Sequence, residues 1–164
     1  MANTDSARRN RTLRQATRLA RQLMPRDGDI DGLVGNLSAH RSRPLTMIDS
    51  DLGQDGPSGL WLATPTKDYI VVDTAGSPSR RAAVICHEVA HILLGHTGDP
   101  VAQDVASLVP NIRPSLAARF LARHGYDEPD EHAAEDLATQ LVAEHTRRDR
   151  AAQLNQNTIS ARLR

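Results

Sequence analysis

Residues 87–91 carry the pattern His-Glu-x-x-His, whose residue types and spacing suit metal-assisted hydrolysis. In a helix, His87 and His91 lie one turn apart on the same face, so both imidazoles can reach one metal ion. Glu88 follows the first histidine and lies where a carboxylate can take a proton from a metal-bound water. Zinc hydrolases use this arrangement. The pattern therefore predicts a zinc site with Glu88 as its catalytic acid/base.

The residues around this pattern are mainly apolar: Val84, Ile85, Val89, Ile92 and Leu93. They predict a buried helix whose histidines point into the protein. Buried neutral imidazoles need polar partners, and a metal ion supplies one. The alternative interpretation is a pair of structural histidines with a surface glutamate.

A catalytic zinc site has three protein ligands and keeps one position open for water. One class of zinc hydrolase takes its third ligand from a histidine six residues after the second. Thr97 occupies that position here, and Gly95 and His96 fall out of register. This class is therefore excluded, and His96 is expected to lie at the helix end near the site.

A second class takes a glutamate from a later helix, and the available acids are Glu128, Glu131, Glu135 and Glu144. Glu131 and Glu135 lie four residues apart on one helix face, beside the small residues Ala134 and Ala138. Small residues allow this helix to approach the first one closely. We expect Glu131 to bind the metal and Glu135 to accept a hydrogen bond from a ligand histidine, which fixes the tautomer of that histidine. His132 is a rival ligand.

Periodicity and turn residues predict the elements that position these groups. Helices are expected at residues 6–24, 30–40, 77–94, 114–124 and from about 131 to 149, with Gly95 capping the third of them. Strands are expected at residues 44–48, 59–64 and 68–72, the last two forming a hairpin. Residues 151–164 contain few apolar groups and are expected to be a flexible tail.

Composition sets broader limits. The chain has 164 residues, which fits one domain, and a formal net charge of zero, which gives no general attraction to nucleic acid or membranes. No apolar run is long enough to span a bilayer, and the polar residues at the N-terminus give the expectation that a signal peptide is absent. Its one cysteine, Cys86, excludes an internal disulfide. A cytoplasmic protein is expected.

Residues 1–26 contain seven arginines and one aspartate, a local charge of +6. A basic helix of this kind can contact DNA phosphates. The favoured interpretation is a solvated helix face that precedes the catalytic domain at 27–150. Binding of DNA by these arginines is kept as an alternative.

The motif helix, the strand at residues 59–62 and the later Glu131-x-x-Ala134 helix together resemble the ImmA/IrrE family of metallopeptidases. The resemblance covers roughly residues 33–142 and is closest to small, arginine-rich members found in actinobacteria and mobile elements. It implies a zincin-like α+β fold: a small three-stranded sheet packed on a mainly helical domain, with the His87–His91 helix at its centre. It also implies His87, His91 and Glu131 as zinc ligands and Glu88 as the catalytic residue. The chain departs from the family at Glu135, where Asn or Asp is usual, and at Leu137, where Phe is usual.

Several members of that family cleave or inactivate a helix-turn-helix repressor. The sequence therefore predicts a zinc endopeptidase whose protein substrate is such a repressor. The alternative is a non-proteolytic anti-repressor that binds its partner and has a structural or vestigial metal site. An extended substrate is expected to lie along an edge strand at residues 68–72.

Overall fold

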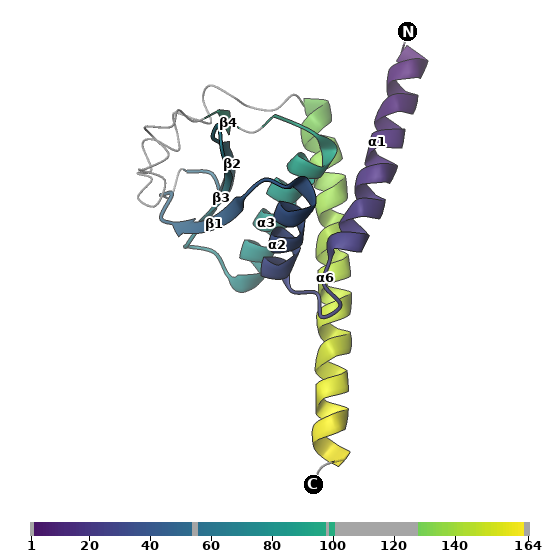
Figure 1. Ribbon diagram of the computed structural model, residues 1–164, viewed down its shortest axis with the longest axis vertical. Coiled ribbons are helices and arrows are strands. Elements are labelled where there is room, and N and C mark those ends of the chain that lie inside the picture. The colour runs from purple at the N-terminus through teal and green to yellow at the C-terminus, as the bar shows by residue number, and fades with distance from the viewer. Residues whose placement is uncertain (1, 54–55, 98, 101–127, 163–164) are drawn as a thin grey trace.

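The computed structural model describes residues 2–53, 56–97, 99–100 and 128–162, and these form an α+β fold. The helices are α1 (Ala2–Leu23), α2 (Ile30–Arg41), α3 (Pro78–Leu94) and α6 (Glu128–Arg162). The strands are β1 (Leu45–Ser50), β2 (Gly59–Ala63), β3 (Asp68–Asp73) and β4 (Asp99–Pro100). The sheet lies on one side of α3, and α1 and α6 lie on the other (Figure 1). The helix expected at residues 114–124 lies outside the described residues.

Helix α3 has the bounds that its sequence predicts. The Ser77 side chain accepts a hydrogen bond from the Arg80 backbone N–H, and Pro78 occupies the first turn, where its missing N–H costs nothing. Gly95 ends the helix with a φ of 76°, which glycine adopts without steric strain. The helix packs against β2 and β3 on one side and against α1 and α6 on the other. Both neighbouring layers therefore fix its orientation.

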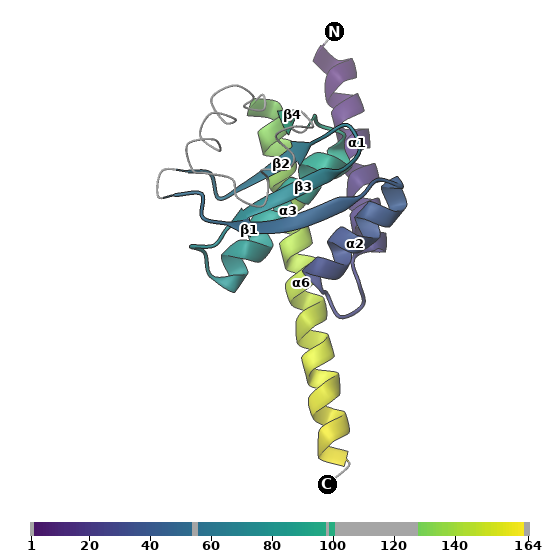
Figure 2. The ribbon, with the colours of Figure 1, turned by 60° about the vertical axis from the view of Figure 1, so that its left-hand side comes forward.

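The sheet has the strand order β1-β3-β2-β4. β2 and β3 form the predicted antiparallel hairpin, β1 pairs in parallel with the other side of β3, and β4 adds two residues beside β2. Residues 68–72 are therefore in an internal strand, and the prediction that they form an edge strand is wrong (Figure 2). Backbone groups on both sides of β3 already pair with neighbouring strands, so no substrate can add there.

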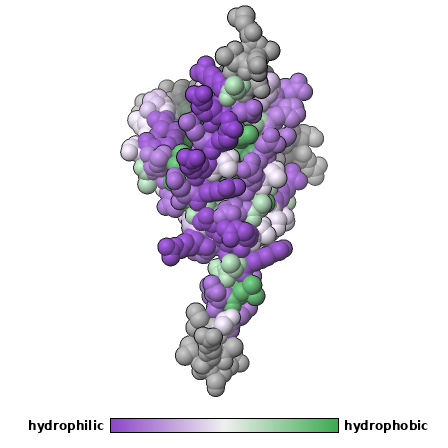
Figure 3. Space-filling model, turned by 90° about the vertical axis from the view of Figure 1, so that its right-hand side faces the viewer, coloured by the Kyte–Doolittle hydropathy of each residue, from purple (hydrophilic) through white to green (hydrophobic). Residues whose placement is uncertain are grey.

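Helix α1 is part of the core. Its Ala16 and Ala20 are buried together with Met24, which directly follows the helix, in the same apolar cluster as Leu137 of α6. The small alanines allow close packing between the helices. The arginines of α1 between residues 8 and 21 are exposed. Figure 3 shows that the face formed by these two helices is largely hydrophilic.

Helix α6 continues to Arg162, so the helix end predicted near Asp149 is wrong. The segment beyond Asp149 contains alanine, glutamine and arginine and has neither proline nor glycine. These residues favour a helix even though few of them are apolar. The last turns extend beyond the rest of the fold (Figure 1), and Leu154 there is 67% exposed.

Arg148 joins α6 to the end of α1. Its guanidinium donates hydrogen bonds to the backbone carbonyls of Arg21, Met24 and Pro25. Carbonyls at a helix C-terminus lack partners within the helix, and a cation there also interacts favourably with the helix dipole. Glu144 forms an ion pair with the same guanidinium, with 2.6 Å between its Oε1 atom and Nε of Arg148. Within the described residues, no helix is long and apolar enough to cross a membrane.

Candidate metal centre

Helices α3 and α6 bring three predicted ligands together. The Nε2 atoms of His87 and His91 are 3.0 Å apart. The two carboxylate oxygens of Glu131, in the first turn of α6, lie 3.5 Å from His87 Nε2 and 3.6 Å from His91 Nε2. All three ligand atoms lie within 4.8 Å of one another. The structure thus forms a cluster that can hold a metal ion from two helices whose ligands lie forty or more positions apart in the sequence.

The dimensions of this cluster fit a tetrahedral ion. Zinc–nitrogen bonds of about 2.0–2.1 Å at tetrahedral angles place neighbouring ligand atoms about 3.3–3.4 Å apart. The two histidine nitrogens are 3.0 Å apart, and each lies 3.5 or 3.6 Å from a different oxygen of Glu131; these separations lie close to that value. Among the described residues the cluster consists of two imidazoles and one carboxylate, which is the three-ligand set that catalytic zinc sites use.

The cluster is buried on one side and open on the other. The His91 side chain is fully buried, whereas those of His87 and Glu131 are 28% and 38% exposed. Burial, together with the nearby rings of His87 and His96, lowers the pKa of His91 to about 3. His91 is therefore neutral at physiological pH and has a lone pair available for a metal, while solvent can reach the cluster from the side of His87.

Glu88 lies on the sheet side of α3. It is only 6% exposed, although it carries a carboxylate. A methyl group at Gly59 of β2 would come within 3.4 Å of the Glu88 Oε1 atom and 2.3 Å of Val84 Cγ1. Glycine at this position therefore allows β2 to pass close to the carboxylate. The Glu88 carboxylate is therefore packed directly against β2.

Two other predicted site residues lie outside this cluster. His132 is exposed, and its Nδ1 contacts the Glu128 carbonyl oxygen at 2.7 Å, within the same turn of α6. Glu135 is also exposed and, with His87, lines a cavity of about 440 Å³ between α3 and α6. Among the described residues, no hydrogen bond connects Glu135 to either ligand histidine. Its predicted role in orienting a ligand stays a prediction.

The sequence reasoning missed the contact that His91 makes on its other ring nitrogen. His91 Nδ1 lies 2.9 Å from Nδ1 of His96, and His96 Nε2 lies 3.6 Å from the Asp130 carboxylate. The side chain of His96 is 10% exposed. The available signal was Gly95, because a glycine cap turns the chain so that the next residue contacts the preceding turn.

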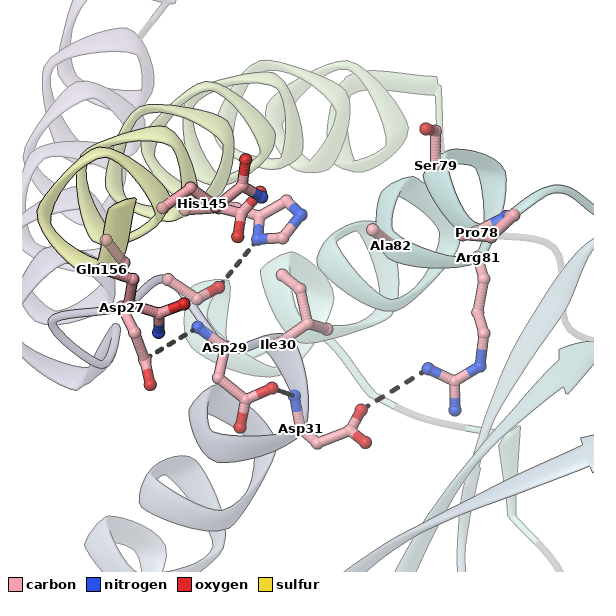
Figure 4. Close-up of a pocket in the computed structure, with 14 residues that line it drawn as sticks. Asp27, Asp29, Ile30, Asp31, Pro78, Ser79, Arg81, Ala82, His145 and Gln156 are labelled. Carbon is pink, nitrogen blue, oxygen red and sulfur yellow. Dashed lines mark hydrogen bonds and ion pairs between the residues drawn. The ribbon is translucent and has the colours of Figure 1, made fainter. Parts of the chain in front are cut away.

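A larger cavity of about 730 Å³ lies at the other end of α3, between the loop before α2 and the far part of α6 (Figure 4). Three of its polar side chains have structural partners. Asp29 caps α2, Asp31 pairs with Arg81 of α3, and His145 of α6 contacts the Gly28 carbonyl oxygen. These contacts connect three helices, and the cavity includes none of the clustered metal ligands.

Cys86 precedes His87 but points elsewhere. It is fully buried, and burial raises the pKa of its thiol to about 12. A thiol with this pKa stays protonated and is a poor nucleophile and metal ligand. Its role is packing.

Neither a scan against protein-family models nor a search of curated proteins found a match to this chain. The geometry of the cluster and the residues that form it are therefore the observations that bear on function.

Proposed function

We propose that this chain is a zinc-dependent endopeptidase with a zincin-like active site, similar to the ImmA/IrrE metallopeptidases. The observation that carries the proposal is the clustering of His87, His91 and Glu131, whose ligand atoms lie within 4.8 Å of one another, with Glu88 buried on the helix that carries both histidines. When bound, zinc supplies a Lewis acid that polarises a carbonyl and acidifies a water molecule.

The side chains have separate tasks in this reaction. His87 and His91 supply neutral nitrogen donors from α3, and Glu131 supplies a negative oxygen donor from α6. Glu88 accepts a proton from the attacking water and later delivers it to the leaving amine. The burial of Glu88 against β2 holds its carboxylate in one place, which favours proton transfer in a defined direction.

We further propose that a substrate binds in an extended conformation along β2. β4 pairs only with Leu62 and Ala63, so within the described part of the chain the stretch 59–61 has no strand partner on that side. Gly59 begins this stretch and lies beside Glu88. A peptide added there by backbone hydrogen bonds would pass close to the proposed acid/base.

A helix-turn-helix repressor is the substrate class that the resemblance implies. The test incubates zinc-loaded protein with such a regulator encoded beside its gene and follows cleavage by mass spectrometry. Wild type should cut the regulator, whereas Glu88→Gln should bind zinc equally and lose at least 100-fold in rate, because general acid–base catalysis contributes about 10²–10⁴-fold. Glu128→Gln, an exposed residue of α6, is the matched control and should cut normally.

The same pair of proteins separates cleavage from simple binding. If Glu88→Gln relieved repression as well as wild type and no fragment formed, the chain would act as a non-proteolytic anti-repressor. Equal cleavage by both proteins would contradict the assigned role of Glu88.

A further inference from the structure

We propose that His96 is a positioning residue for the metal ligand His91, and that Asp130 sets the tautomer of His96. The three side chains lie in a row leading away from the metal cluster. This inference rests on the proposed metal site but assigns a role to two residues outside it. Its contacts are the 2.9 Å approach of the two Nδ1 atoms and the 3.6 Å separation of His96 Nε2 from Asp130 Oδ1.

The end of α3 places His96 where it can do this. The His96 backbone N–H donates to the His91 carbonyl at 3.0 Å, and the Gly95 N–H donates to the Ile92 carbonyl at 3.2 Å. These two bonds form a Schellman motif, in which the residue after the capping glycine packs on the residue five positions earlier. An apolar contact is usual at that place. Here it is a contact between two imidazoles whose centroids are 5.0 Å apart.

The acceptor and donor roles in this row follow from the atom that faces Asp130. The carboxylate oxygen of Asp130 is a hydrogen-bond acceptor, so it favours the form of His96 with its proton on Nε2, the nitrogen 3.6 Å away. Nδ1 of His96 then has a lone pair and accepts from Nδ1–H of His91. With that proton on Nδ1, the lone pair of His91 is on Nε2, which is the atom facing His87 and Glu131. This arrangement of protons agrees with both contacts of the row and puts the lone pair of His91 on the nitrogen that faces the other two ligands.

The same geometry argues against His96 as a fourth ligand. Its Nδ1 faces the His91 nitrogen that points away from the cluster, and its Nε2 faces Asp130. Metal-bound histidines commonly donate their second N–H to a hydrogen-bond acceptor, which fixes the ring and raises its basicity as a ligand. Asp130 and Glu131 are neighbours in the first turn of α6. This turn therefore supplies the proposed ligand Glu131 and also Asp130, the carboxylate that contacts His96.

The first test reads the tautomers directly. Long-range ¹H–¹⁵N spectra of zinc-loaded protein with ¹⁵N-labelled histidine distinguish Nδ1–H from Nε2–H, and the His96→Asn variant identifies the His96 signals. We expect His96 to carry its proton on Nε2 and His91 to carry its proton on Nδ1. A spectrum with the His96 proton on Nδ1 would overturn the proposal.

The second test measures zinc affinity by competition with a chromophoric chelator. His96→Leu keeps bulk but removes the acceptor, and it should weaken zinc binding by about 10–100-fold. His96→Asn places an amide oxygen near the former Nδ1 position and should recover most of that loss. His132→Leu, on the exposed side of α6, is the matched control and should bind zinc like wild type.

A purely structural role would produce a different result. In that case both His96 variants would lower the urea midpoint of the metal-free protein and leave the visible spectrum of the Co²⁺-loaded protein unchanged, which would refute positioning. If His96 were a ligand, asparagine would not restore affinity. If wild type bound no zinc, the proposed metallopeptidase function would be refuted. This outcome differs from a failure of the positioning role, because it is seen in wild type without any variant.

Discussion

Replacing Gly59 by alanine tests whether β2 packs so closely against α3 that no side-chain atom fits between them. The new methyl carbon would lie 2.3 Å from Val84 Cγ1, whereas ordinary contacts begin at 3.4 Å, so strand and helix must separate by about 1 Å or Val84 must rotate. Such overpacking costs about 1–3 kcal/mol. With a urea m value of about 2 kcal/mol/M, the unfolding midpoint should fall by about 0.5–1.5 M.

The control for this substitution is Gly35→Ala in α2, where no atom lies within 4 Å of the added methyl group. Alanine favours a helix more than glycine does, so this variant should gain about 0.5–1 kcal/mol. Adding Val84→Ala to Gly59→Ala should restore part of the lost stability, because it removes the closest contact. A neutral Gly59→Ala variant, or a double variant with purely additive losses, would refute the packing argument.

Two further predictions concern charges. Arg148→Met should destabilise the protein by about 1.5–3 kcal/mol, because it removes charged hydrogen bonds to the backbone carbonyls of Met24 and Pro25 at the end of α1. Arg147→Met should cost much less, because this side chain is exposed and its ion pair with Glu144 is screened by solvent. Urea unfolding at pH 7 measures both variants, and equal losses would contradict the assigned role of Arg148. The second prediction concerns His91, whose pKa is lowered from 6.5 to about 3 in the folded chain. At a pH between these two values, the unfolded chain therefore binds a proton at His91 that the folded chain does not. The unfolding free energy of the metal-free protein should therefore fall as pH decreases from 6.5 to 5, by up to about 1.4 kcal/mol per pH unit more in wild type than in His91→Gln, and identical slopes would contradict this.

The sequence predicts those parts of the structure that depend on local chemistry. Ser77, Pro78 and Gly95 determine where α3 begins and ends, because each satisfies or removes an unpaired backbone group at a helix terminus. The spacing of His87 and His91 then places both rings on one face. Glu131 was harder to assign, since its position depends on how α6 packs against α3. Its small neighbours Ala134 and Ala138 were the useful signal.

The strand order depends on pairing between distant segments, and local patterns did not predict it. β1 pairs with the outer side of β3 and makes it internal. A signal was present, because Tyr69-Ile70-Val71-Val72 is a continuous apolar run of the kind found in strands that are covered on both faces. The contact between His96 and His91 was missed for a related reason: the two side chains meet through the geometry of the cap, which helical periodicity does not describe.

The central claim is that α3 and α6 together hold one metal ion. Zinc stoichiometry by native mass spectrometry tests this claim most directly. Wild type and Glu88→Gln should each carry one Zn²⁺ per chain at a modest excess of zinc, whereas Glu131→Ala, which retains both histidines of α3, should lose the ion under the same conditions. The account would be contradicted by wild type that carries no zinc, or by Glu131→Ala that retains zinc as well as wild type does.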